Sequence, residues 1–509
     1  MTIREHLNAS LETKSLSTGA RLAKNSVALF MMAVLTRGAG LIVAVLVARY
    51  LGAAALGTYA AVMGLILVLE NIAIGQTYII IRQVARDRTG LFSFWLNTSV
   101  ATLLVSAMLS VTLVVTIHLF VKDIDYLKSA YIVAVFLPIA GLYYIAQAFV
   151  QGLEEMEMIT ISALIGRVVG LLVLWLLLRS GLGVAVAFIG NGTFQLVTLL
   201  VLCWAILRKV GLSGAIREAK FDLVQCWTSL RLSVPFTIQN LLRSGFAQIN
   251  VLILPLLVTM KIVGMFDAAD RVRQTSVMII SIVTLSILPT LSRTVLTDRE
   301  RAMALMETAL KLLHVLILPF VFFIAIAADQ IIPLLYGPGY EAAVPVLRVV
   351  AWAQVFFAAD AMLNQILMAS NNETRMVRNT ALSLGVNVIL LLALTSRYGV
   401  IAAAWIVVAT TALNLALDSQ FVNRHITPFK LFGTISKPLL CAIISGGIAL
   451  VTHSHGLWVS LVFYCSTYLI LLWILRVFTN HELLLARQLA IQLWRRVVAL
   501  KGSSINSIR

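Results

Sequence analysis

The chain has 509 residues and a formal net charge of +17 at pH 7. Apolar residues make up 60% of the sequence and charged residues only 12%, whereas soluble domains are about 45–50% apolar and about 25% charged. A nucleic-acid-binding protein would gather its positive charge on one soluble face, but here the charge falls in short gaps between apolar runs. The composition therefore excludes a single soluble core and a nucleic-acid partner, and it predicts a membrane protein.

Residues 1–24 form a polar, basic segment that we expect to lie in the cytoplasm. The apolar run after it is long and has no small-residue cleavage site, which favours a retained membrane span over a signal peptide.

Long apolar runs then follow one another along the chain. A bilayer core about 30 Å thick needs roughly 20 apolar residues per helix, and open sheet edges would leave backbone groups unpaired in lipid. We therefore predict an all-α polytopic membrane protein. Its fourteen helices are expected at residues 25–48, 54–81, 91–119, 127–151, 158–179, 183–207, 232–257, 262–290, 303–328, 343–369, 376–396, 399–422, 434–452 and 457–478.

The loops between these helices alternate in positive charge, and cytoplasmic loops are the ones rich in Lys and Arg. One set of loops holds many basic residues: Arg82, Arg86, Arg88, Arg208, Lys209, Arg217, Lys220, Arg293, Arg299, Arg301, Arg375 and Arg378. The other set holds few, among them Lys122, Lys128 and Lys261. A loop with Glu154 and Glu155 departs from this pattern. The alternation predicts that both ends of the chain are cytoplasmic.

An internal repeat relates the two halves of the chain. A shift of 207 residues lays Gly38 on Gly245 and Gly57 on Gly264 without a gap. Six spans separate the copies, so the repeat is parallel, and transporters built this way bind substrate between their two lobes. The repeat predicts two six-helix lobes, with two further helices after them.

This repeat gives the domain boundaries. We expect an N-lobe at 25–207, a cytoplasmic loop at 208–231, a C-lobe at 232–422, the last two helices at 434–478 and a cytoplasmic tail at 479–509. Within the tail, apolar residues at 485, 489, 493, 497 and 500 lie on one helical face and arginines lie elsewhere. That pattern is typical of a basic amphipathic helix on a membrane surface; a frayed, solvated tail is the alternative.

Several ionisable or polar side chains lie inside the predicted spans, where they are costly and mark functional sites. The candidates for a substrate-binding cavity are Arg37, Arg167, Gln239, Arg243, Asn250, Arg271, Lys311 and Asn364. Several arginines in one cavity suit an anionic substrate, because guanidinium matches phosphate oxygens in a fork. Glu70 and Asp360 are the candidates for binding a coupling ion.

Structural explanations stand beside these assignments. Asp267 and Arg271 are spaced to pair on one helix face, as are Glu307 and Lys311. Arg167 is close enough to a predicted membrane surface to snorkel. Glu70 and Asp360 could serve as counter-ions for arginines in the membrane, and His314 is better explained as a packed core residue than as a relay.

The sequence contains no motif for covalent chemistry or ATP hydrolysis. There is no GxxxxGK[ST] and no HExxH, and no loop is long enough for a catalytic domain. None of the four cysteines, Cys203, Cys226, Cys441 and Cys465, has a CxxC partner. We expect a secondary transporter that is not an enzyme, has no cofactor or metal, and is coupled to a proton or sodium gradient or to the membrane potential.

Five segments resemble the polysaccharide and O-antigen flippases of the multidrug/oligosaccharidyl-lipid/polysaccharide (MOP) exporter superfamily. They are Ala48-Arg49-Tyr50-Leu51-Gly52, Leu56-Gly57-Thr58-Tyr59, Val263-Gly264-Met265-Phe266-Asp267-Ala268-Ala269, Ile287-Leu288-Pro289 and Leu335-Tyr336-Gly337-Pro338-Gly339-Tyr340. The resemblance covers roughly residues 20–425. It implies two lobes in a V around a central cavity.

The resemblance also implies a function in the bacterial inner membrane. The substrate would be an undecaprenyl-diphosphate-linked oligosaccharide, flipped to the outer leaflet by a monomeric transport unit that works with membrane lipids, a polysaccharide polymerase and glycosyltransferases. The related peptidoglycan-precursor flippases carry two arginines in the first span; Arg37 matches the first, but Val43 stands at the second. A peptidoglycan-precursor flippase and a small-molecule multidrug antiporter of the same superfamily remain the alternatives.

Overall fold

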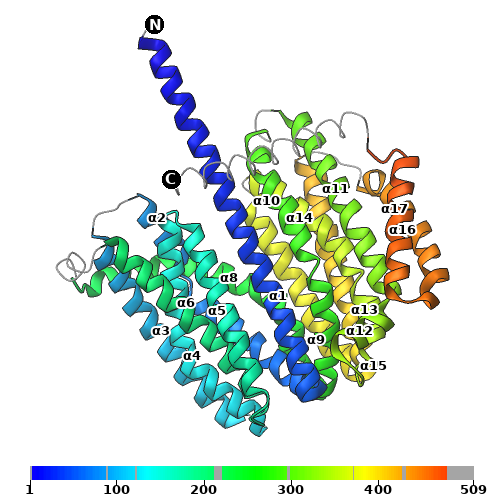
Figure 1. Cartoon of the computed structure of the whole chain (residues 1–509), viewed down its shortest axis with the longest axis horizontal. Helices are drawn as coiled ribbons and strands as arrows, with labels where there is room; N and C mark the ends of the chain where they lie inside the picture. The colour runs from blue at the N-terminus through cyan, green and yellow to red at the C-terminus, as the bar shows by residue number, and fades with distance from the viewer. Residues whose placement is uncertain are drawn as a thin grey trace, which may run out of the picture.

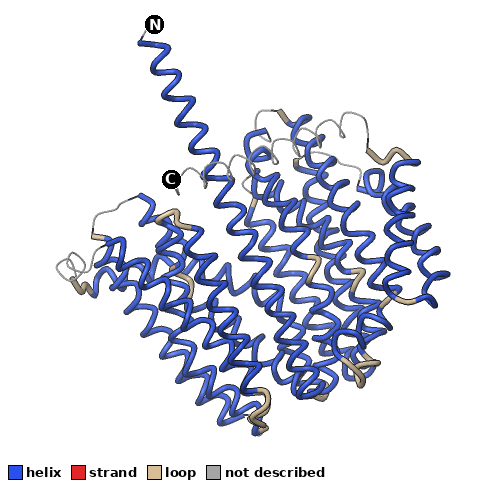
Figure 2. Tube along the Cα trace, viewed as in Figure 1, coloured by secondary structure: helices blue, strands red, loops and turns tan. Residues whose placement is uncertain are grey.

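The computed structural model describes residues 3–86, 90–120, 123–210, 220–294, 298–370, 372–426 and 431–478. These ranges contain helices joined by short turns and no strand, which confirms the all-α fold (Figure 2). The amphipathic helix predicted at 482–500 lies outside the described residues.

The N-terminal half is built from long helices. They are α1 (Ile3–Ala73), α2 (Thr77–Arg86), α3 (Leu91–Phe120), α4 (Ile124–Gly152), α5 (Met156–Leu177) and α6 (Ala185–Val210). The C-terminal half contains α8 (Leu223–Leu257), α9 (Met260–Gln274), α10 (Val277–Thr294), α11 (Arg299–Ile326), α12 (Ala328–Tyr336), α13 (Ala343–Val350), α14 (Ala353–Ala369), α15 (Glu373–His425), α16 (Leu431–Thr452), the 3-10 turn η1 (His453–His455) and α17 (Leu457–Ile474).

Helices and spans do not correspond one to one. Among the described residues, ten helices are long and apolar enough to cross a membrane, and two of these, with 52 and 53 residues, are long enough to cross it twice. Both bend at a glycine with positive φ, Gly52 (φ 84°) in α1 and Gly399 (φ 71°) in α15, a conformation that glycine adopts at no steric cost. The more polar α8 and the pair α9–α10 supply the two remaining spans, which gives the fourteen that were predicted.

Two boundaries differ from the sequence prediction. Helix α8 begins at Leu223, inside the segment predicted as a loop, because the Asp222 carboxylate caps it by accepting a hydrogen bond from the Val224 N–H at 2.8 Å. The second span is broken by a turn at residues 74–76, after which α2 continues it.

The helices form two groups with α1 between them. On one side α3 packs on α4 and α6 packs on both α4 and α5; on the other α14 packs on α15, α10 and α11. The groups meet at the end of the bundle that holds Gly52, here called the Gly52 end, and diverge toward the end that holds α2, here called the α2 end (Figure 1). Helices α16 and α17 lie outside both groups, with α16 against α11, as the repeat predicted.

The repeat-related residues meet each other where α1 crosses α9. A Cβ placed on Gly57 would lie 1.8 Å from the Met260 carbonyl oxygen, and one on Gly264 would lie 2.0 Å from the Ala53 carbonyl oxygen. The 207-residue shift exchanges these two contacts, so the axis that relates the lobes passes between the two glycines. The lobes are joined here backbone to backbone.

Gly57→Ala or Gly264→Ala is therefore expected to destabilise the protein by about 1–3 kcal/mol, because a methyl group must push two backbones apart. Gly38→Ala and Gly245→Ala are matched controls, since these glycines are also related by the repeat but have nothing within 4 Å of the added Cβ. Thermal unfolding of the detergent-purified variants measures the difference. Equal melting temperatures in both pairs would contradict the crossing.

Side chains close the Gly52 end around this crossing. Arg49 donates from Nε to the Leu335 carbonyl oxygen at 2.8 Å. The Tyr336 hydroxyl donates to the Ala268 carbonyl oxygen at 3.0 Å, and the Tyr340 hydroxyl to that of Ala48 at 3.4 Å. The bonds of Arg49 and Tyr340 join the two lobes, whereas that of Tyr336 lies within the C-terminal lobe. All three residues belong to segments that carry the family resemblance.

Candidate functional site

A cavity of about 200 Å³ lies between the crossing and the α2 end. We call it the arginine cavity. It is lined by residues of α1, α4, α5, α6 and α9: Thr36, Ala39, Gly40, Val43, Tyr59, Met63, Leu67, Glu70, Tyr144, Arg167, Gly170, Leu171, Leu174, Gly190, Asn191, Phe194, Gln195 and Arg271. It thus brings together three of the residues predicted from the sequence, Glu70, Arg167 and Arg271.

The charge of Arg271 is partly neutralised by Asp267, which lies on the same helix. Its Nε donates to Asp267 Oδ2 at 2.5 Å, and its Cζ lies 5.3 Å from the centre of the Tyr59 ring. The pairing of Asp267 with Arg271 one helical turn apart is thereby confirmed. Arg271 still lines the cavity, so it can offer further N–H groups, but it brings little net charge.

Arg167 is the cation with unused donors. Its Cζ lies 3.5 Å above the centre of the Phe194 ring, and its Nε is buried without a hydrogen-bond partner. Among the described residues, no carboxylate forms a salt bridge with it. A half-buried guanidinium without hydrogen bonds among the described residues is costly unless a ligand meets it. The side chain lines the cavity.

Glu70 already has a donor for each carboxylate oxygen. Gln195 Nε2 donates to Oε1 at 2.7 Å, and the Tyr144 hydroxyl donates to Oε2 at 3.2 Å. The side chain is only 5% exposed. In this cavity both carboxylate oxygens of Glu70 have hydrogen-bond donors, whereas the Nε of Arg167 has no acceptor in the part of the chain that the structure describes. This difference favours an anionic ligand.

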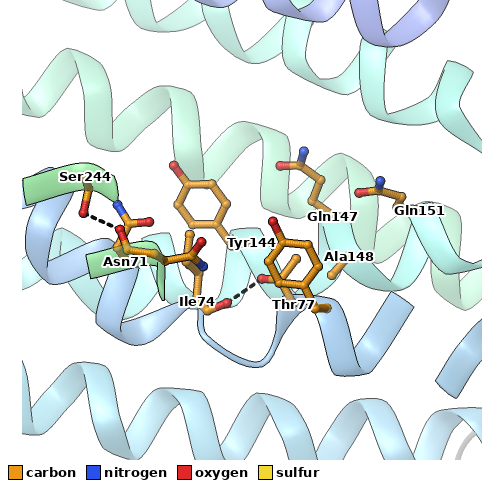
Figure 3. A pocket seen from close by; sticks show the side chains of 10 residues that line it. Asn71, Ile74, Thr77, Tyr144, Gln147, Ala148, Gln151 and Ser244 are labelled. Atoms are coloured by element: carbon orange, nitrogen blue, oxygen red, sulfur yellow. Dashed lines mark hydrogen bonds between the residues drawn. The ribbon is translucent and has the colours of Figure 1, made fainter. Parts of the chain in front are cut away.

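A second pocket, with no charged residue in its described lining, adjoins the first toward the α2 end. Its volume is about 370 Å³, and Tyr144 lines both spaces. We call it the amide pocket, after its described lining: Asn71, Ile74, Thr77, Tyr78, Tyr144, Gln147, Ala148, Gln151, Asn240 and Ser244. Figure 3 shows Tyr144, Gln147 and Gln151 along α4, opposite Asn71 and Ser244. The search for charged residues in the sequence missed this pocket, whose only signal was the spacing of Tyr144, Gln147 and Gln151 on one helix face.

Asp360 belongs to a separate, buried polar network in α14 and α15. Its Oδ2 accepts hydrogen bonds from Asn364 Nδ2 at 3.1 Å and from Asn414 Nδ2 at 2.9 Å. Asp418 accepts one from Asn379 Nδ2 at 2.7 Å, and it lies close enough to Asp360 for the two carboxyl groups to interact electrostatically. Amides and a second carboxyl group therefore surround Asp360. Nothing in the sequence distinguished Asp418.

One oxygen of each carboxyl group in this network, Asp360 Oδ1 and Asp418 Oδ2, is buried without a hydrogen-bond partner in the described part of the chain. Neighbouring buried carboxylates repel each other when both are ionised. A shared proton or a bound cation would relieve that repulsion and give the two oxygens a partner.

Arg37, Asn250 and Lys311 are not among the residues that line either pocket. Arg37 is exposed on α1, next to Thr36 of the arginine cavity, and Lys311 is half-buried on α11. Asn250 on α8 has a buried Oδ1 without a hydrogen-bond partner. The backbone of α8 includes Gln239 and Arg243, whose side chains lie outside the described residues.

His314 is a packed core residue, as the sequence favoured. It is fully buried, and its ring nitrogens lie 2.8 Å from the Leu310 carbonyl oxygen and 3.3 Å from that of Val355.

Known proteins resemble this chain in sequence. A family model described as polysaccharide biosynthesis protein matches residues 22–295, more than half of the chain. A protein of Escherichia coli (strain K12) assigned as an O-antigen transporter is 23% identical over 304 residues, covering 59% of this chain and 72% of that protein. Agl15 of Haloferax volcanii, assigned as a flippase of low-salt glycan biosynthesis, is 21% identical over 204 residues, covering 40% of this chain and 43% of that protein.

Solved structures share the fold. The lipid II flippase MurJ in an inward closed conformation superimposes with a TM-score of 0.69 at 14% identity, covering 89% of this chain and 98% of that chain. A multidrug resistance MATE family transporter of the MOP superfamily, inward-facing, gives a TM-score of 0.61 at 14% identity over 78% of this chain and 98% of that chain. The chain belongs to the polysaccharide biosynthesis protein family and has the fold of MOP-superfamily transporters.

Proposed function

We propose that this protein flips an undecaprenyl-diphosphate-linked oligosaccharide from the cytoplasmic to the outer leaflet of the bacterial inner membrane. The observation that carries the proposal is the half-buried guanidinium of Arg167, which lines the arginine cavity and whose Nε has no hydrogen-bond partner among the described residues. A diphosphate cannot enter hydrocarbon without a cationic partner, and a planar guanidinium matches two of its oxygens at once. The relatives assigned as glycan transporters support the same substrate class.

The two alternatives fit the cavity less well. Within the arginine cavity the one described carboxylate, Glu70, accepts a hydrogen bond at each oxygen, whereas a small-cation antiporter would need it as the cation's ligand. A peptidoglycan-precursor flippase would have a second arginine in the first span, and in this chain Val43 lines the cavity at that position. The cavity wall is therefore apolar where that class is cationic.

Transport would proceed by alternating access. The lobes meet at the Gly52 end, and the amide pocket lies toward the α2 end, which the loop charges assign to the cytoplasm. A return state that opens the Gly52 end must break the hydrogen bonds that Arg49 and Tyr340 make to the opposite lobe. Related transporters rock two repeats about a fixed site in this way.

Topology is tested by reporters that are active only outside the cytoplasm. Fusions after Lys128 or His455 are expected to be active, and fusions after Arg88 or Arg301 to be silent, because basic loops stay inside. The reverse pattern at any two of these sites would overturn the proposed orientation.

The Asp360–Asp418 pair is proposed to couple transport to a proton or sodium gradient. We expect Asp360→Asn and Asp418→Asn to retain the fold and lose the acceleration of flipping by an imposed gradient, because an amide releases neither ion. Asp298→Asn, at the exposed cap of α11, is the control. Proteoliposomes with defined proton and sodium gradients provide the measurement; unchanged gradient dependence in both variants would leave Glu70 as the remaining candidate.

Analysis of lipid-linked intermediates in a deletion strain tests the function itself. The expected result is a lipid-linked oligosaccharide that accumulates on the cytoplasmic leaflet and is cleared by the wild-type gene. Normal surface glycan in the deletion strain, together with drug sensitivity, would support the antiporter instead. Loss of viability with accumulated peptidoglycan precursor would support the other alternative.

A further inference from the structure

We infer that the amide pocket is a carbohydrate subsite, which takes the uncharged sugar attached directly to the diphosphate. This inference rests on the proposed function and adds to it the chemistry by which the glycan is recognised. Its volume of about 370 Å³ falls within the roughly 300–1,000 Å³ typical of small-molecule sites. The lining residues indicate which ligand a pocket of this size can bind.

The polar groups of the pocket are amides and hydroxyls. An amide offers both donors and acceptors, and a sugar hydroxyl or acetamido group needs both. Among the described residues, no hydrogen bond is made by the side-chain amides of Asn240 and Gln151, and Asn71 uses only Nδ2, which donates to the Leu67 carbonyl oxygen at 2.6 Å. These three side chains come from three different helices, α8, α4 and α1, so they can contact one ring from several sides.

The pocket also contains aromatic surface. Tyr78 is 50% exposed and lines the pocket. Its ring is held by stacking on Phe236 of α8, with ring centres 5.5 Å apart and an interplanar angle of 27°. A rigid tyrosine supplies a large contact surface with little loss of conformational entropy, and the apolar C–H face of a pyranose packs on such a ring.

The position of the pocket determines which sugar it can hold. Tyr144 lines both the amide pocket and the arginine cavity, so the two spaces are contiguous. A diphosphate at Arg167 would place its first sugar at the amide pocket and leave the remaining sugars toward the α2 end. The subsite therefore recognises the sugar proximal to the lipid.

The pocket is also built from both lobes. Asn240 and Ser244 are on α8, the first helix of the C-terminal repeat, whereas the remaining lining residues are on α1, on α2, in the turn between these two helices, and on α4. At the same level Gly75 packs so closely on α8 that an added Cβ would lie 1.8 Å from Thr237 Oγ1. A bound sugar thus contacts both lobes, and its binding depends on their relative position.

The test compares two probes, undecaprenyl diphosphate alone and the same lipid carrying one N-acetylglucosamine. Binding of each to the purified full-length protein in nanodiscs is measured by native mass spectrometry. The wild type is expected to bind the sugar-bearing probe about tenfold more tightly, from the net gain of one or two hydrogen bonds. The double variant Asn240→Leu, Gln151→Met keeps the side-chain volumes and should bind both probes equally.

Two controls separate this inference from the proposed function. Gln420→Met, on an exposed part of α15, should preserve the tenfold preference. Arg167→Ala should lower the affinity for both probes by a similar factor, so the ratio of the two affinities should stay unchanged. Equal affinity of the wild type for both probes would overturn the carbohydrate subsite while the flippase proposal stands, as would a preference that survives in the double variant. Binding of neither probe would overturn the proposed function and this inference with it.

Discussion

Arg167→Ala is expected to abolish glycan export without lowering the amount of protein in the membrane. The guanidinium lines the arginine cavity with unpaired donors, and two charge-assisted hydrogen bonds to a diphosphate contribute about 1.5–3 kcal/mol each. Their loss corresponds to a fall in affinity of roughly 100-fold or more. Arg167→Lys should recover only part of the activity, because lysine keeps the charge but loses the planar fork.

Arg179→Ala is the matched control for this substitution. Arg179 follows α5, is exposed, and also lies over an aromatic ring, with its Cζ 4.4 Å from the Trp175 centre. Its loss removes the same charge and the same kind of ring contact, so export should stay normal. Surface glycan and the pool of lipid-linked intermediate are measured in complemented deletion strains. Normal export by Arg167→Ala would show that Arg167 is not the counter-charge of the substrate.

A reversible cross-link across the Gly52 end is expected to stop transport completely. Arg49 donates to the carbonyl oxygens of Leu334 and Leu335, so Arg49→Cys and Leu334→Cys place a cysteine on each side of the closure. The chain's own four cysteines are first replaced by serine or alanine. A bifunctional thiosulfonate then prevents the end from opening, and alternating access requires that opening. Reduction of the cross-link should restore the initial rate.

A cross-link inside one lobe serves as the control. His118 and Tyr131 lie at the same end on α3 and α4, with His118 Nδ1 and the Tyr131 hydroxyl 3.0 Å apart. His118→Cys with Tyr131→Cys therefore reacts with the same reagent but joins no moving parts. Transport that continues at full rate with the Gly52 end cross-linked would contradict the rocking of two lobes.

The spans and the repeat could be predicted from the sequence because both leave local signals. Apolar runs of helical length and charged loops each depend only on neighbouring residues. Gly57 and Gly264 matched each other in the sequence at a shift of 207 residues. In the structure these two glycines allow α1 and α9 to cross in close contact. The breaks between spans were less predictable, since Gly52 and Gly399 bend continuous helices where loops were expected.

The site was only partly predictable, because its residues come together from separate helices. Ionisable residues inside spans stand out in a sequence, and three of them, Glu70, Arg167 and Arg271, do share a cavity. Asn71, Gln151 and Asn240 carry no charge and lie on three different helices; only Gln151 had a signal in the sequence, its spacing from Tyr144 and Gln147 on one helix face. Asp418 was missed for a related reason, because its partner Asp360 is on another helix.

Flipping in reconstituted vesicles tests the central claim most directly. Proteoliposomes are loaded with undecaprenyl diphosphate bearing a short labelled oligosaccharide, and a membrane-impermeant glycosidase added outside reports how much substrate crosses the bilayer. The wild-type protein and Arg179→Ala are expected to expose the inner-leaflet pool to the enzyme, while Arg167→Ala exposes no more than protein-free vesicles. Equal crossing in the wild type and in protein-free vesicles would contradict the account.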